Sequence, residues 1–126
     1  MRDFKKLLVW QKGMEIAEET SKASNDFPSE EKYGLRSEII RSAVTIHSSI
    51  AEASAKSSEH EYKQHIEIAL GSSFELETKL LVVQRLGWLK EEVVRKLLAM
   101  IIEEQRMLAS LWMKLKFEAA YNSFKP

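Results

Sequence analysis

The chain of 126 residues contains no cysteine, two prolines and four glycines, and its charges cancel. Without cysteine there is no disulfide, no thiolate nucleophile and no Cys-ligated zinc, which fits a protein of a reducing cytoplasm. No apolar run approaches the ~20 residues that cross a bilayer, and the apolar stretch near the start is too short for a signal peptide. We therefore expect a cytoplasmic protein with no membrane partner.

Composition also limits the class of fold. Lysine and arginine together number 19, as do aspartate and glutamate, so net charge provides no long-range attraction to nucleic acid or to an anionic membrane. Any polyanion site would have to be local. Both prolines lie outside the periodic segments, which leaves long stretches free to be helical. The chain is therefore expected to form one all-α domain over residues 1–126, near the common size for a single core.

Apolar residues recur at alternating spacings of three and four along four segments, the pattern of amphipathic helices. We predict helices over about residues 8–24, 35–54, 58–86 and 90–117, followed by a frayed tail. Ser58 and Glu61 form a capping box ahead of the third helix, and Gly87 suits the left-handed position that ends it. Short connections make neighbouring helices antiparallel, so we predict an up-down-up-down four-helix bundle.

The third and fourth helices carry more apolar residues than one four-helix core needs. A soluble protein covers such an excess most simply by self-association. The predicted oligomer interface consists of Phe74, Leu81, Trp88, Met100, Met107 and Leu111, whereas Trp10 and Trp112 are assigned to the core. The alternative is that widened core positions absorb all of these residues.

No catalytic pattern is present in the sequence. Phosphate-binding loops, nucleophile elbows and the paired Glu-x-x-His ligands of di-iron bundles are all missing. We predict no enzymatic activity, no cofactor and no metal. The alternative is a small-molecule- or metal-binding bundle that uses His47, His60, His65 and Glu61, because Glu61 and His65 share one helix face.

Charge position is more informative than total charge. In an alternating bundle the N-terminal arm, the turn before the third helix and the C-terminal tail lie at one end. The candidate contacts for a polyanion such as RNA at this end are Lys5, Lys6, Lys12, Lys56, Lys114 and Lys116. The alternative is an ordinary solvated surface, since no aromatic residues are interleaved in a basic motif.

Several segments together resemble the small proteins encoded within intervening sequences of bacterial 23S ribosomal RNA genes. The N-terminal half contributes Leu8-Val9-Trp10-Gln11-Lys12, the loop from Phe27 to Leu35, Ala43-Val44-Thr45-Ile46 and Ile50-Ala51-Glu52. The C-terminal half contributes Ala69-Leu70-Gly71-Ser72, the run from Glu75 to Leu81, and Leu86-Gly87-Trp88-Leu89. These segments span almost the whole chain in order.

The resemblance implies a cytoplasmic four-helix bundle that forms a homo-oligomer, a ring of five in this family, with no established enzymatic activity. A related protein, the accessory protein of diversity-generating retroelements, binds nucleic acid together with a reverse transcriptase but is more basic. This chain departs from the family pattern at three places, since His47 replaces a frequent proline, Ile40 an arginine and Ala53 a glycine. The resemblance thus favours an assembly protein that contacts RNA or a protein partner.

Overall fold

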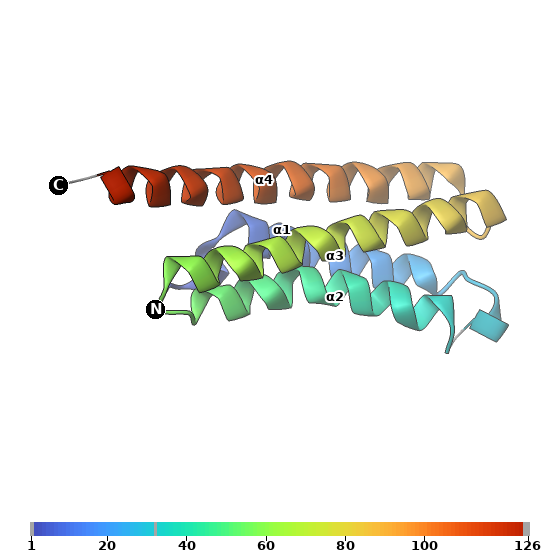
Figure 1. Ribbon diagram of the computed structural model, residues 1–126. Coiled ribbons are helices and arrows are strands. Elements are labelled where there is room, and N and C mark those ends of the chain that lie inside the picture. Colours follow the sequence, from blue (N-terminus) through green and yellow to red (C-terminus); the bar gives the residue numbers. More distant parts are fainter. Residues whose placement is uncertain (1, 32, 125–126) are drawn as a thin grey trace.

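The computed structural model describes residues 2–31 and 33–124, with side chains up to residue 116. The chain contains four helices and two short 3-10 turns in this order: η1 (Phe4–Lys6), α1 (Leu8–Ser24), η2 (Ser29–Glu31), α2 (Leu35–Ser54), α3 (Glu59–Leu86) and α4 (Glu91–Phe124). Consecutive helices run in opposite directions and pack side by side along their length (Figure 1). The prediction of an all-α, up-down-up-down four-helix bundle is confirmed.

Local sequence determines where α3 begins and ends. The Ser58 hydroxyl accepts a hydrogen bond from the backbone N–H of Glu61 at 3.1 Å, which satisfies one of the free donors of the first turn. At the other end, Gly87 has a positive φ of 69°, and its N–H and that of Trp88 donate to carbonyls of the last turn. The serine cap and the glycine stop are thus both present, and of the predicted capping box the structure shows the Ser58 half.

The core is one continuous apolar cluster that runs the length of the bundle. The whole predicted stripe of α3 is buried, from Tyr62 to Val83 at alternating spacings of four and three. In α2 the stripe from Ile39 to Ala53 is buried as well, and the helix continues without a break through His47, as expected from the absence of proline there. The bundle therefore closes around four matched apolar stripes.

Helix α4 is longer than predicted. Its end was expected near residue 117, but the helix continues to Phe124, so the prediction of a frayed tail was wrong for this segment. The residues beyond 117 include Glu118, Ala119 and Ala120, which are good helix formers, and no proline lies between residue 117 and Pro126. Loss of apolar periodicity removes a reason for burial, but it does not end a helix whose backbone hydrogen bonds are local.

Candidate functional site: apolar surfaces on both sides of helix α4

The six predicted interface residues lie in different places. Met100 is only 7% exposed and belongs to the core of the single chain, so its side chain has little surface to offer a second subunit. Trp88 packs on Phe27 with a ring-centroid distance of 5.5 Å and covers one end of the bundle. The remaining four residues divide between two surfaces, with Met107 and Leu111 on one and Phe74 and Leu81 on the other.

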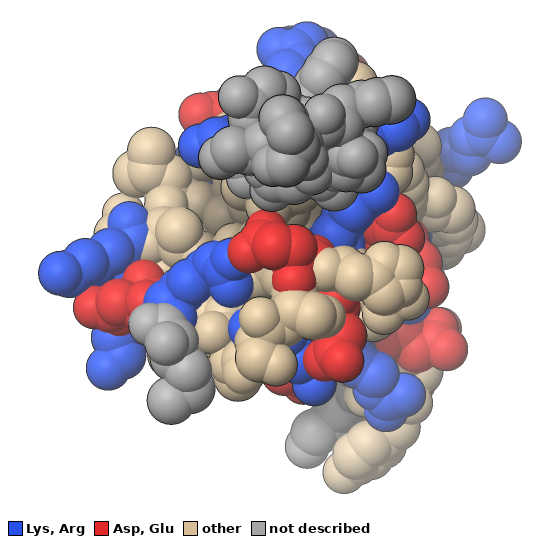
Figure 2. All heavy atoms as spheres, turned by 60° about the vertical axis from the view of Figure 1, so that its left-hand side comes forward, with Lys and Arg blue, Asp and Glu red and all other residues tan. Residues whose placement is uncertain are grey.

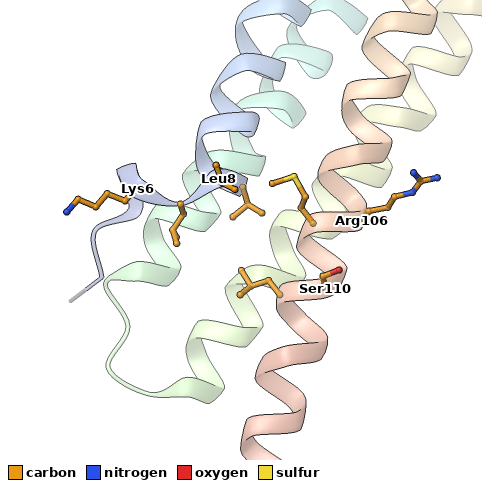
Figure 3. Close-up of a pocket in the computed structure, with 8 residues that line it drawn as sticks. Lys6, Leu8, Arg106 and Ser110 are labelled. Atoms are coloured by element: carbon orange, nitrogen blue, oxygen red, sulfur yellow. The ribbon is translucent and has the colours of Figure 1, made fainter.

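The first surface is a groove between the start of α1 and the middle of α4, called here the α1–α4 groove. Its lining residues are Lys6, Leu7, Leu8, Val9, Arg106, Met107, Ser110 and Leu111. Leu8 is 69% exposed, a high value for a leucine beside a packed helix pair. Figure 3 shows that Lys6 and Arg106 extend away from the groove on its two sides. The groove thus has apolar walls and a cationic rim.

The second surface, called here the α3–α4 ridge, is formed by Phe74 and Leu81 of α3 with Ile102 and Met113 of α4. All four are exposed, Phe74 by 50% and Leu81 by 41%. Hydrogen bonds across the helix pair fix the register, because Gln105 donates to Glu77 at 2.8 Å and Trp112 donates to Glu67 at 2.6 Å. This register places Ile102 level with the stretch between Phe74 and Leu81.

The ridge also contains a shallow apolar hollow. Its lining residues are Glu67, Leu70, Gly71, Phe74 and Trp112. A Cβ atom added at Gly71 would meet nothing within 4 Å, so this glycine opens the surface and does not serve close packing of helices inside the protomer. Exposed large apolar side chains around an open hollow are typical of a surface that another molecule covers.

The six candidate lysines form no uniform basic patch, and Lys12 lies toward the middle of the bundle and not at its end. Figure 2 shows basic and acidic side chains intermingled on this face. Lys12 forms an ion pair with Glu103 at 3.0 Å, and Lys116 lies over the Trp112 ring at 5.3 Å. Lys56 is half-buried, and Lys5, Lys6 and Lys114 are exposed. Only part of the predicted set is therefore available to a polyanion.

The residues of the metal-binding alternative do not converge. His60 contacts Gln64, and His65 contacts the Glu61 carbonyl at 2.9 Å and Glu52 at 3.7 Å. His47 lies elsewhere on α2, beside Trp10. Among the side chains that the structure describes, those of residues 2–31 and 33–116, no group of three or more from His, Cys, Asp or Glu could hold a metal ion. The geometry thus gives this alternative no support.

Sequence reasoning missed the most unusual charged residue of the fold. Glu104 is fully buried between α4 and α1, and neither carboxyl oxygen has a hydrogen-bond partner among the described residues. Burial raises the pKa of Glu104 to about 8, against the opposing attraction of Lys12. The sequence feature that could have indicated burial of Glu104 is its spacing. Glu104 falls three residues after Ile101 and four before Leu108, and both of these are buried.

A second polar group lies at the same level of the bundle. A Cβ atom added at Gly13 of α1 would lie 2.8 Å from the Cβ of His47 and 3.2 Å from Oε2 of Glu104. Burial lowers the pKa of His47, although the nearby Ala43 carbonyl acts in the opposite direction. The half-buried imidazole is therefore neutral at neutral pH and adds no positive charge beside the carboxyl.

Comparison with known proteins agrees with this architecture. A solved structure of a protein with unknown function from the S23 ribosomal protein family, from Bacteroides thetaiotaomicron, matches with a TM-score of 0.78 at 22% identity. The match covers 83% of this chain and 98% of that one. Comparison with curated proteins gave no match. The described part of the chain contains no helix long and apolar enough to cross a membrane.

The family comparison covers most of the sequence. The family described as 23S rRNA-intervening sequence protein matches residues 5–110, which include all of α1, α2 and α3, and α4 as far as Ser110. The predicted resemblance is thereby confirmed, and the chain belongs to the 23S rRNA-intervening sequence protein family.

Proposed function

We propose that this protein is a non-enzymatic assembly protein whose copies join head to tail, with the α3–α4 ridge of one subunit in the α1–α4 groove of the next. The observation that carries the proposal is the presence of two separate apolar surfaces on a bundle whose own core is complete. Each large apolar side chain that such contact removes from water contributes roughly 1.5–3 kcal/mol.

Charge supports this pairing of unlike surfaces. The rim of the groove carries Lys6 and Arg106, whereas the ridge carries Glu67 and Glu77, which bind Trp112 and Gln105. Two lysines, Lys63 and Lys116, lie over the Trp112 ring, so the acidic part of the ridge is the stretch beside Glu77. Opposite charges around an apolar centre favour contact between groove and ridge over contact of either surface with itself. A contact between two different surfaces generates a closed ring or an open filament, according to the rotation between subunits. A ring of five is the form that family resemblance favours.

Light scattering coupled to size exclusion tests assembly directly. We expect the wild-type chain to elute as a multimer, and Leu8→Asp in the groove and Phe74→Asp in the ridge each to give a single-copy species. Val44→Asp is the matched control, because Val44 is 42% exposed on α2 and belongs to neither surface. A wild-type chain that stays single-copy at high concentration would exclude the proposal.

Mixing the two variants tests the head-to-tail geometry. Leu8→Asp keeps an intact ridge and Phe74→Asp keeps an intact groove, so the mixture should form a two-subunit complex and nothing larger. Contact of like surfaces predicts instead that each variant still pairs with itself through its intact surface, and that mixing forms no new complex. This outcome would leave assembly standing and remove only the pairing of groove with ridge.

A second candidate function is contact with RNA through the lysine-bearing end. It is favoured by Lys5, Lys6 and Lys114, which are exposed and form no ion pair with a carboxylate of the described residues. Binding of structured RNA should weaken steeply with salt and fall when these three lysines are changed to glutamate. The control reverses exposed cations at the opposite end of the bundle, namely Lys90 just before α4 and Arg95 and Lys96 in its first turns. Equal loss in both variants would exclude a local RNA site.

A further inference from the structure

The seam between α1 and α4 is unusually close where Gly13 faces Glu104. The Glu104 carboxyl lies against the space that a Cβ atom of residue 13 would fill, and so does the Cβ of His47. Three helices therefore meet around an acid that has no hydrogen-bond partner in the described structure. Burial of a polar group without a partner is unfavourable, and burial of a charge without one is far more so.

The chain neighbours of Gly13 and Glu104 line a solvent-facing hollow, although Glu104 itself does not. A hollow beside the α1–α4 groove is lined by Leu8, Gln11, Lys12, Glu15, Glu103 and Met107. Within it, Lys12 of α1 and Glu103 of α4 form an ion pair at 3.0 Å, and the Lys12 side chain is only 18% exposed. This ion pair joins the two helices one residue away from Gly13 on α1 and one residue away from Glu104 on α4.

We propose that Glu104 is a proton-operated latch on the α1–α4 seam, whose neutral carboxyl lets α1 close on α4 and whose ionisation favours an opened seam. In the opened state the carboxylate reaches water and Lys12, while α2 and α3 stay paired. The inference concerns the single chain, goes beyond the assembly proposed above and does not depend on it.

The charges around Glu104 explain why opening is the response to ionisation. On α1, Lys12 attracts the carboxylate but already binds Glu103, the neighbouring acid on α4, which repels it. On α2, His47 is neutral. On α3, the carboxylate of Glu77 accepts a hydrogen bond from Gln105, next to Glu104 in the chain. The closed seam thus offers one cation to two acids, and a second negative charge there lacks compensation.

The direction of the pH effect follows from the two states. The closed seam retains the Glu104 proton up to the raised pKa of about 8, whereas an opened, solvated carboxyl loses it near the ordinary value of 4.5. Between these values opening releases a proton, so the opened population rises by up to tenfold per pH unit and levels off above about pH 8. Acid therefore closes the latch.

Hydrogen exchange of the intact chain measures this opening. After correction for the intrinsic pH dependence of exchange, amides of α1 should exchange faster than those of the α2–α3 core. Their exchange should accelerate up to tenfold per unit between about pH 5.5 and 7.5. Glu104→Gln preserves size and cannot ionise, so it should abolish this slope. The control Glu92→Gln changes an exposed acid in the first turn of α4, away from the seam, and should keep it.

Two results would overturn the latch. A slope that persists in Glu104→Gln assigns the proton to another group, and α1 amides that exchange no faster than the α2–α3 core show that the seam does not open separately. If Glu104→Gln fails to fold, the carbon-13 shift of the Glu104 carboxyl in the wild-type chain decides the matter. A titration midpoint near 8 supports the latch, and one near 4.5 excludes it.

Discussion

At the residue scale, the buried carboxyl of Glu104 makes the stability of the fold depend on pH. Its folded pKa of about 8 lies above the value of 4.5 expected in the unfolded chain. Between these values the folded state holds a proton that the unfolded state releases. The free energy of unfolding should therefore fall by up to ~1.4 kcal/mol per pH unit as pH rises. Urea titrations from pH 5 to 8 should show this decline.

Glu104→Gln should remove most of that decline. The two proteins should be similar near pH 5, and the variant should be more stable by roughly 3 kcal/mol at pH 7, since glutamine needs no proton to stay neutral. Glu92→Gln, which changes an exposed acid in the first turn of α4 away from Glu104, serves as the control and should retain the wild-type pH dependence. A variant less stable than the wild type at every pH would contradict the prediction.

Replacing glycine by alanine should change the stability of the fold in opposite directions at two positions. At Gly13 a methyl group would lie 2.8 Å from the Cβ of His47, an atom fixed by its backbone, so Gly13→Ala should destabilise the fold by ~1–3 kcal/mol. At Gly71 the methyl group would meet nothing within 4 Å, so Gly71→Ala should stabilise α3 by ~0.5–1 kcal/mol. Chemical denaturation measures the free energy of unfolding of both variants. Changes of the same sign in the two variants would be inconsistent with this packing.

At the scale of the helix, the start of α3 depends on one side chain. Ser58→Ala removes the hydroxyl that accepts from the Glu61 N–H and should cost ~1 kcal/mol of stability. Ser57→Ala is the matched control, because Ser57 is exposed and precedes the cap. Thermal unfolding should separate the two variants, and equal melting temperatures would show that the cap contributes nothing.

The helices themselves could be predicted well from sequence because their determinants are local. Apolar spacing locates α1 and α2 at residues 8–24 and 35–54, and the Ser58 and Gly87 signals bound α3. The end of α4 was missed because residues after 117 lack an apolar stripe yet retain strong helix formers. A pattern of burial therefore predicts which face packs, whereas helix length also depends on propensity.

The site was harder to predict, because two neighbouring stripes of residues on one helix are related by a small rotation about the helix axis. On α4 both Glu104 and Gln105 fall at core spacing between Ile101 and Leu108, so spacing alone does not choose between them. The structure buries Glu104, together with Met100, and leaves Gln105 to bond Glu77 of α3. Only the position of α1, brought close by Gly13, decides between the two.

At the scale of the whole molecule, the cationic rim of the groove should affect assembly more than folding. Arg106→Glu should weaken subunit association by a factor of roughly 3–10, because a rim charge contributes up to ~1 kcal/mol in water. Analytical ultracentrifugation measures the dissociation constant. Arg41→Glu, an exposed change on α2 outside both surfaces, is the control. Equal effects of the two changes would argue against charge pairing at the groove.

The length of α4 has a consequence for any assembly of this chain. With 34 residues α4 is roughly 50 Å long, while α1 with 17 residues is about half as long. The C-terminal turns of α4 project past the neighbouring helices (Figure 1). Subunits joined head to tail around one axis all point the same way. In a closed ring with α4 along the ring axis, the C-terminal ends of α4 would all project from the same face. The two faces of the ring would then offer a binding partner different surfaces.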